Sequence, residues 1–404
     1  MKKKLVQYGA GNIGRGFIGD LFSRADYEVV FIDIQKSVIE QFNRVGEYPV
    51  RYVSDEGYSE YTVTGVRAVD GMDLEAVKDE IASADCMATA VGVSALPHII
   101  EPIASGLRKR WASGNYSPLN FIICENLIDA DKFIRGLFYE VFSDSERKHF
   151  DKLVGLVEAS IGRMIPIMTP EAQEGNILRV CVEKYAELPI DKDAMKCDIP
   201  NVPGLIPASP FAFYIRRKLF LHNMGHALTA YLGWLNKVTY ISESIRIPFI
   251  RLIAAGAMQQ SARALSKSYG IELYSILDHV DDLIVRFHNY ALGDTNERVG
   301  RDPIRKLALS DRLTGAAIFC AEQGLRFTYI TVGIAAGLLY NNSEDESSLK
   351  IQAKINQQGF GKSLYDYCGI NNKSVIGQQV HMFYEMLKSD HGLDKILHKA
   401  DTLR

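Results

Sequence analysis

Residues 5–33 read LVQYGAGNIGRGFIGDLFSRADYEVVFID, and they contain the clearest structural signal in the chain. An apolar run ends at Tyr8, a glycine-rich turn follows, and a second apolar run ends at Asp33. Residues 13–23 connect the turn to the second run with apolar residues at helical spacing. A strand, a turn, a helix and a second strand in this order predict a βαβ unit with parallel strands.

The turn carries Gly9, Gly11 and Gly14 in the spacing G-x-G-x-x-G. In a dinucleotide-binding turn the first glycine permits the sharp bend, the second lets a pyrophosphate approach, and the third lets the helix pack on the strand. Asn12 and Ile13 lie between these glycines, and we assign them to the same phosphate-binding turn. A glycine turn that binds no nucleotide is the alternative, because the motif alone is common.

Asp33 ends the second strand nineteen residues after Gly14. A carboxylate at this spacing can accept hydrogen bonds from the adenosine ribose hydroxyls. It also repels a 2′-phosphate, so the sequence favours NAD over NADP, with the nearby Lys36 leaving NADP as the alternative.

Two further strand ends are expected at the edge of the sheet where the nicotinamide would bind. Thr89 and Gly92 end one strand, and Glu125 and Asn126 end the next. The carboxyl ends of parallel strands meet at one edge, so these residues are candidates for the cofactor and substrate site. The alternative is that they are ordinary turn residues, which bond their own backbone.

Later apolar runs at 86–91, 121–124 and 154–157 extend the same alternation of strands and helices. Residues 49–53 and 60–66 alternate polar and apolar side chains, which predicts an antiparallel hairpin inserted in the sheet. The first half is therefore expected to be a doubly wound, Rossmann-type parallel sheet in an α/β protein.

Four prolines lie within residues 198–210, and a segment of this kind neither continues a helix nor pairs in a central strand. We therefore predict an NAD-binding domain over 1–197 and a substrate-binding, catalytic domain over 198–404. Residues 211–236, 243–269 and 271–292 have helical apolar spacing, so the second domain should be mostly α-helical. No sustained heptads are present, which favours a monomer or weak homodimer.

The 404 residues include 46 Lys and Arg against 49 Asp and Glu, so the net charge of −3 argues against a general nucleic-acid binder. The longest apolar run, 329–340, is shorter than the ~20 residues of a membrane-spanning helix. Residues 2–4 are basic, but no signal-peptide core follows them. The six cysteines are dispersed, which argues against disulfides and a thiolate metal site. We expect a cytoplasmic protein that binds neither nucleic acid nor membrane.

One helical segment concentrates polar residues in an apolar background. At ~100° per residue, Lys218, His222, Asn223 and His226 fall on one side of an α-helix. A lysine and an asparagine there could supply the base and the hydrogen-bond donors for oxidising an alcohol without a metal. The alternative is that Lys218 extends to solvent, His222 is a core histidine and Asn223 bridges helices.

Three motifs together resemble the mannitol dehydrogenase family of polyol-specific long-chain dehydrogenases. They are GAGNIGRGFIG at 9–19, CENL at 124–127 and KLFLHNMGHA at 218–227. The resemblance covers both expected domains and implies a zinc-independent, NAD-dependent, reversible oxidation of a polyol to a ketose.

The same resemblance assigns roles to four residues. It implies that Lys218 is the general base, that Asn126 and Asn223 hydrogen-bond the reacting oxygen, and that His226 orients substrate hydroxyls. A base lysine requires a lowered pKa, which burial near other positive charge would give.

Residues 296–306 form a basic stretch that also resembles the phosphate-sugar branch of the family. Arg298, Arg301 and Arg305 could hold a substrate phosphate, because guanidinium groups bind phosphate through two hydrogen bonds. The alternative is a solvated loop in which Arg298 and Arg301 pair with Glu297 and Asp302.

The resemblance therefore implies conversion of D-mannitol 1-phosphate to D-fructose 6-phosphate as the expected reaction. An unphosphorylated polyol or a hexuronate is the alternative substrate within the same family. A hydroxyacid dehydrogenase or a non-catalytic, NAD-binding regulatory protein would be alternatives of other kinds.

Overall fold

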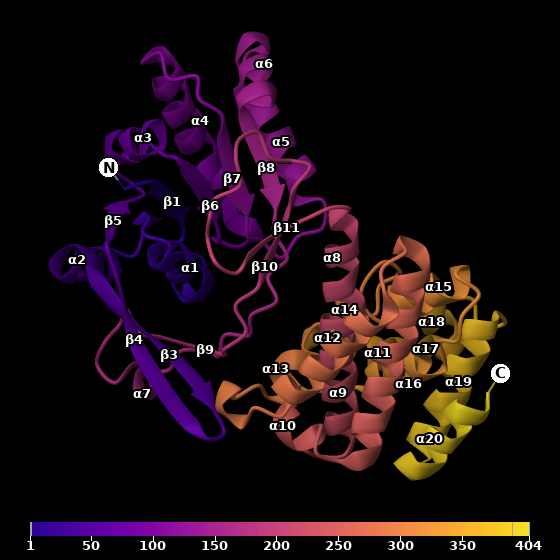
Figure 1. Ribbon diagram of the computed structural model, residues 1–404. Helices are drawn as coiled ribbons and strands as arrows, with labels where there is room; N and C mark the ends of the chain where they lie inside the picture. Colours follow the sequence, from indigo (N-terminus) through magenta and orange to yellow (C-terminus); the bar gives the residue numbers. More distant parts are fainter. Residues whose placement is uncertain (1, 390, 404) are drawn as a thin grey trace. The chain divides into compact units, whose positions relative to one another are not determined.

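The computed structural model describes residues 2–389 and 391–403, and the chain divides into two compact units, 1–214 and 215–404 (Figure 1). The proline-rich segment belongs to the first unit, since β11 (Leu205–Ala208) pairs in parallel with β10 (Leu188–Asp191). The domain boundary between residues 197 and 198 stays a prediction.

The first unit is built on a parallel sheet of six strands in the order β5-β2-β1-β6-β7-β8. The strands are β1 (Lys4–Tyr8), β2 (Glu28–Asp33), β5 (Val66–Asp70), β6 (Cys86–Thr89), β7 (Leu119–Ile123) and β8 (Val154–Glu158). The order reverses between β1 and β6, as in dinucleotide-binding sheets, where ligands bind beyond the carboxyl ends of the strands. The predicted Rossmann-type fold is confirmed.

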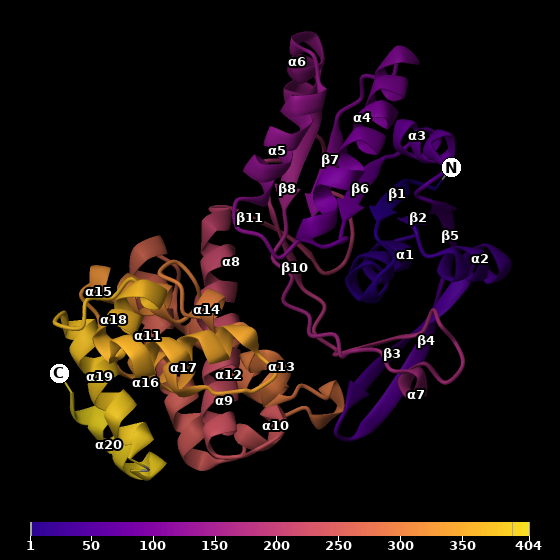
Figure 2. The same cartoon turned by 180° about the vertical axis from the view of Figure 1, so that it is seen from behind.

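Helices cover both faces of this sheet (Figures 1 and 2). Alternate side chains of each strand point to opposite faces, so Leu5 joins the core beneath α1 and α2 whereas Val6 joins the core beneath α3 to α6. The helices are α1 (Asp20–Arg24), α2 (Lys36–Val45), α3 (Leu74–Ala82), α4 (Leu96–Ala112), α5 (Ala130–Val141) and α6 (Asp144–Leu153), with a short turn η2 (Val93–Ala95) before α4.

The predicted hairpin is present but forms a sheet of its own. Strands β3 (Glu47–Ser54) and β4 (Gly57–Thr64) pair antiparallel, and β9 (Val180–Val182) adds in parallel to β3. The expectation that the hairpin reaches Val66 was wrong, because Gly65 turns the chain at φ 71° and Val66 starts β5 of the main sheet. A short helix, α7 (Pro170–Gln173), precedes β9.

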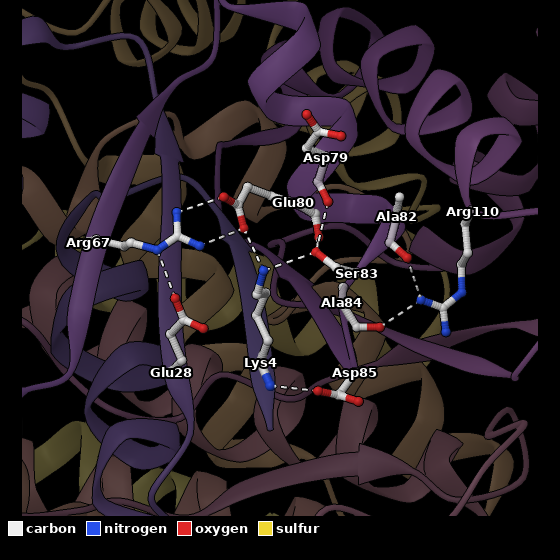
Figure 3. A network of polar contacts seen from close by, with 10 residues as sticks. All are labelled: Lys4, Glu28, Arg67, Asp79, Glu80, Ala82, Ser83, Ala84, Asp85 and Arg110. Atoms are coloured by element: carbon white, nitrogen blue, oxygen red, sulfur yellow. Dashed lines mark hydrogen bonds and ion pairs between the residues drawn. The ribbon is translucent and has the colours of Figure 1, made fainter. Parts of the chain in front are cut away.

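A network of charged side chains lies at the amino ends of the strands of this sheet (Figure 3). Arg67 holds both carboxylate oxygens of Glu80 at 2.7 Å, and Lys4 Nζ lies 2.8 Å from the same carboxylate. Arg110 donates to the carbonyl oxygens of Ala82 and Ala84 at 3.0 and 2.8 Å. These contacts join β1, β5 and the end of α3 at the edge opposite the glycine turn.

The helix after the glycine turn begins with a π-helical turn, η1 (Gly14–Gly19). Two of its carbonyl groups accept hydrogen bonds from distant side chains, because Tyr48 Oη donates to Arg15 at 2.7 Å and Arg163 Nη1 donates to Gly16 at 2.8 Å. Arg163 also forms an ion pair of 2.9 Å with Asp20, and both of these side chains are fully buried. The hairpin and the segment after β8 therefore hold this helix in place.

The second unit is helical, as predicted. Helix α8 (Phe211–Arg217) begins in the first unit and leads into a π-helical turn, η3 (Lys218–Asn223). The elements that follow are α9 (Met224–Leu235), α10 (Ile241–Ser244), α11 (Pro248–Tyr269), α12 (Leu273–Phe287), η4 (Tyr290–Leu292), α13 (Asn296–Gly300), α14 (Pro303–Lys306), α15 (Thr314–Glu322), α16 (Thr328–Leu339), α17 (Glu346–Gln358), α18 (Phe360–Cys368), α19 (Val375–Lys388) and α20 (Leu393–Thr402).

The most apolar helix, α16, is almost completely buried among the other helices of this unit. An apolar helix that is covered on all sides is a core helix. Across the described parts of the chain, 2–389 and 391–403, none of the helices combines the length and the apolar character needed to cross a membrane.

The cysteines contribute to packing. Five of them are buried and Cys197 is partly buried, and all six have free thiols. Burial raises the pKa of Cys320 and of Cys368 to about 12.

Replacing Asp20 should destabilise the first unit strongly. Asp20→Asn leaves the fully buried Arg163 guanidinium without a counter-charge, and breaking a buried ion pair from one side costs about 3–5 kcal/mol. Urea denaturation followed by circular dichroism measures the free energy of unfolding. Glu346→Gln, which removes the exposed partner of Lys350, is the control and should cost below about 1 kcal/mol. Equal losses in the two variants would contradict the structural role of Asp20.

Candidate active site

The glycine turn is packed too closely for side chains at Gly9 and Gly14 and is open at Gly11. Gly9 has φ 91°, and a Cβ there would lie 2.5 Å from the carbonyl oxygen of Ala90. A Cβ on Gly14 would overlap the carbonyl oxygen of Gly9, so the helix packs too closely on the turn for any side chain. Gly11 is exposed, and no atom lies within 4 Å of its Cβ position. Asn12 and Ile13 are partly buried and begin the helix.

Asp33 lies beside this turn. Its Oδ2 accepts a hydrogen bond of 2.7 Å from the amide of Ala10, within the glycine motif. Its Oδ1 accepts bonds of 2.8 and 3.0 Å from the amides of Ile34 and Gln35. The structure thus brings together the predicted glycine turn and the predicted acidic residue, and it fixes the carboxylate by three backbone donors.

Thr89 and Gly92 are also brought together, through Glu125. The Glu125 carboxylate accepts hydrogen bonds from Thr89 Oγ1 at 3.0 Å, from the Val91 amide at 2.8 Å and from the Gly92 amide at 2.9 Å. Burial raises the pKa of Glu125 although these three bonds oppose the shift. The next residue, Asn126, is exposed at the end of β7. Glu125 therefore joins the carboxyl ends of β6 and β7.

In the second unit, Lys218 starts the π-helical turn η3 and Asn223 ends it. Four candidate residues lie on this continuous helical segment, but the π-turn means that α-helical angles do not describe their spacing. Burial lowers the pKa of Lys218 to about 8, and the positive charge of Arg312 adds to the shift. A lysine with this pKa can exchange a proton near neutral pH.

His226, on α9, lies close to aromatic and acidic side chains of other segments. Its ring stacks on Phe287 with centroids 5.0 Å apart, and the ring of His222 lies 6.0 Å away. His226 Nε2 is 3.3 Å from Oδ2 of Asp294, without hydrogen-bond geometry. Burial, with Arg298 next in effect, lowers the pKa of His226 to about 3, so the imidazole is neutral at physiological pH.

The arginines of the basic stretch have different environments. Arg298 forms an ion pair with Asp294, which brings it to the carboxylate beside His226. Arg305 pairs with Asp302 at 3.0 Å, and both Arg301 and Arg305 are exposed. The alternative pairing of Arg298 with Glu297 was wrong, because Asp294 lies one helical turn before Arg298.

Sequence reasoning missed three residues that contribute to these sites. They are Phe287, Asp294 and Arg312. The spacing of four residues between Asp294 and Arg298 was a usable signal for an ion pair. The stacking of Phe287 on His226 joins residues far apart in the chain, and no local pattern indicates it. Within the described residues, no group of three or more His, Cys, Asp or Glu is arranged to bind a metal ion.

Two family sequence profiles match the chain. The profile for the mannitol dehydrogenase Rossmann domain matches residues 3–204, and the profile for the mannitol dehydrogenase C-terminal domain matches residues 211–379. The two matches follow one another without overlap and together cover most of the sequence.

Individual proteins show the same likeness. The chain is 36% identical over 365 residues to mannitol-1-phosphate 5-dehydrogenase of Brevibacillus brevis, which covers 90% of this chain and 93% of the relative. Its fold is similar to that of a D-sorbitol dehydrogenase crystallised without substrate (TM-score 0.83, 15% identity, 98% and 95% of the two chains). It is also similar to Pseudomonas fluorescens mannitol 2-dehydrogenase in a ternary complex with NAD and D-mannitol (TM-score 0.78, 15% identity, 100% and 95%).

The two successive profile matches and the full-length relative agree with the motifs and with the Rossmann-type and helical units. The chain belongs to the mannitol dehydrogenase family.

Proposed function

We propose that the chain is an NAD-dependent polyol phosphate dehydrogenase that interconverts D-mannitol 1-phosphate and D-fructose 6-phosphate. The observation that carries the proposal is Lys218, whose pKa of about 8 suits a general base, on the helical segment that also carries Asn223 and His226. The choice of a phosphorylated substrate is supported by the 36% identical relative, a mannitol-1-phosphate 5-dehydrogenase.

The glycine turn would hold the dinucleotide. Gly9, Gly11 and Gly14, with Asn12 and Ile13, form a turn that leads into a helix, and the open space above Gly11 fits a pyrophosphate. Asp33 would accept hydrogen bonds from the ribose hydroxyls, and Thr89 and Gly92 would lie at the nicotinamide end. Bound NAD supplies the acceptor for a hydride from the alcohol carbon.

The chain's own side chains would manage the proton. In its neutral form, Lys218 would take the proton of the substrate hydroxyl, and burial keeps that form available. Asn126 and Asn223 would donate hydrogen bonds to the reacting oxygen as negative charge develops on it. His226, neutral at physiological pH, would bind substrate hydroxyls, and Arg298, Arg301 and Arg305 would attract the phosphate.

Other features expected from the sequence stay predictions. They are the cytoplasmic location, the monomeric or weakly dimeric state, and the domain limits 1–197 and 198–404.

A paired assay of NADH absorbance tests the substrate directly. We expect turnover of D-mannitol 1-phosphate with NAD and of D-fructose 6-phosphate with NADH, because phosphate recognition adds binding energy that the free sugars lack. Mannitol and fructose serve as controls. Turnover of only the free sugars or of a hexuronate would transfer the proposal to those substrates, and no turnover on any of them would favour a non-catalytic, NAD-binding role.

The pH profile of alcohol oxidation tests Lys218. Because its pKa is lowered to about 8, the neutral base accumulates as the pH rises through 8, so kcat should rise and level off above about pH 9. Lys218→Ala should lower kcat by about 10²–10⁴-fold while NADH binding, measured by fluorescence, persists. Lys350→Ala removes an exposed lysine and is the control. An unchanged rate and profile in Lys218→Ala would refute the base assignment.

Cofactor binding tests the contribution of Glu125. In Glu125→Gln one of the buried donors from Thr89, Val91 or Gly92 loses its acceptor, and we expect the Kd for NADH to increase on the order of tenfold. Fluorescence titration with NADH measures it without turnover. Glu101→Gln, on the exposed side of α4, is the matched control. A lower melting temperature with an unchanged Kd would show that Glu125 acts on stability alone.

A further inference from the structure

Arg312 is a cation of the second unit whose charge also acts on Lys218. It lies just before α15, and only 11% of its side chain is exposed. Its Nε donates to Oδ1 of Asp311 at 2.8 Å, and among the described residues this carboxylate is its one hydrogen-bond partner. The two terminal nitrogens of the guanidinium can therefore donate a pair of parallel hydrogen bonds to a ligand.

The position of Arg312 is close to the proposed catalytic segment. At the start of α15, Gly315 packs so closely on η3 that a Cβ would lie 3.2 Å from the ring of Phe220. The rings of Phe220 and Phe319 lie 5.5 Å apart and continue this contact between η3 and α15. Consistently, the charge of Arg312 contributes to the lowered pKa of Lys218, of His226 and of Lys306.

Two neighbouring cations, Arg305 and Lys306, each have two polar partners, whereas the side chain of Arg298 has one carboxylate partner among the described residues, as Arg312 does. Arg298 pairs with Asp294, and Arg305 pairs with Asp302 at 3.0 Å and reaches Asp311 at 3.7 Å. The ammonium of Lys306 is buried and donates to the carbonyl oxygens of Val299, at 2.6 Å, and of Arg301.

We propose that Arg312 binds the anionic group of the substrate, a phosphate monoester, through its two terminal nitrogens. The inference rests on the proposed function and adds a specificity-determining residue to it. A planar guanidinium can donate two parallel hydrogen bonds to two phosphate oxygens. Arg312 is largely buried and has a single carboxylate partner, Asp311, so a second negative charge would stabilise its positive charge further. Arg298 and Lys306 would add positive charge around the same group.

Two substitutions separate the charge of Arg312 from its pair of donors. Arg312→Gln removes both, whereas Arg312→Lys keeps the charge and loses the two-pronged geometry. We expect the KM for D-mannitol 1-phosphate to rise about 10–100-fold in both variants while the Kd for NADH stays unchanged. Only Arg312→Gln should move the pH profile of kcat to higher pH, because the pKa of Lys218 rises when the neighbouring charge is removed.

The matched control is Arg263→Gln, because Arg263 is an exposed arginine on α11 that donates a hydrogen bond to the Gln259 carbonyl oxygen of its own helix. Calorimetric titration with inorganic phosphate measures anion binding without turnover, and we expect binding to wild type and to Arg263→Gln but at least tenfold weaker binding to Arg312→Gln.

The outcomes distinguish this inference from the proposed function. An active wild type with an unchanged KM in Arg312→Gln would overturn the role of Arg312 and leave the function standing. A wild type inactive on polyol phosphates would overturn the proposed function, and phosphate binding that is equal in wild type and Arg312→Gln would then overturn the anion site too. Weaker phosphate binding by Arg312→Gln supports the site in either case.

Discussion

The buried ion pair of Asp20 and Arg163 is the contact on which the nucleotide-binding half depends. Asp20 is the first residue of α1, directly after the π-helical turn η1, and its carboxylate also accepts a hydrogen bond of 2.5 Å from Tyr61 of the hairpin. Arg163 lies between the rings of Phe17 and Tyr52, 5.5 Å from each. Because charges of this kind are costly to bury unless paired, the helix after the glycine turn, the hairpin and the segment after β8 must assemble together.

Burial also determines the chemistry of the helical half. Desolvation lowers the pKa of Lys218 from 10.5 to about 8 and that of His226 from 6.5 to about 3. Both side chains are therefore neutral at a lower pH than they would be in water. Asp294 and Asp311 each hold an arginine beside this segment. The positive charge of the arginines thereby stays close to Lys218 and His226 and favours their neutral forms, which are the forms that accept protons.

Local patterns predicted most of the fold because they depend on neighbours in the chain. The glycine spacing, the strand pattern up to Asp33 and the helical periodicity after residue 211 each report on a few consecutive residues. The ion pair of Asp20 with Arg163 and the bonds of Glu125 to Thr89 and Gly92 join segments that meet only in the folded chain. The π-helical turns that begin at Gly14 and Lys218 had no signal of their own in the helical periodicity of the sequence.

The buried cysteines have a practical consequence for spectroscopy. Alkylating and thiol-exchange reagents react with the thiolate, and burial raises the pKa of each thiol, including that of the partly exposed Cys197. At neutral pH the native thiols are therefore poor nucleophiles. A single cysteine introduced at an exposed position of either unit would react first, so a fluorophore or spin label could be attached while all six native cysteines remain in place.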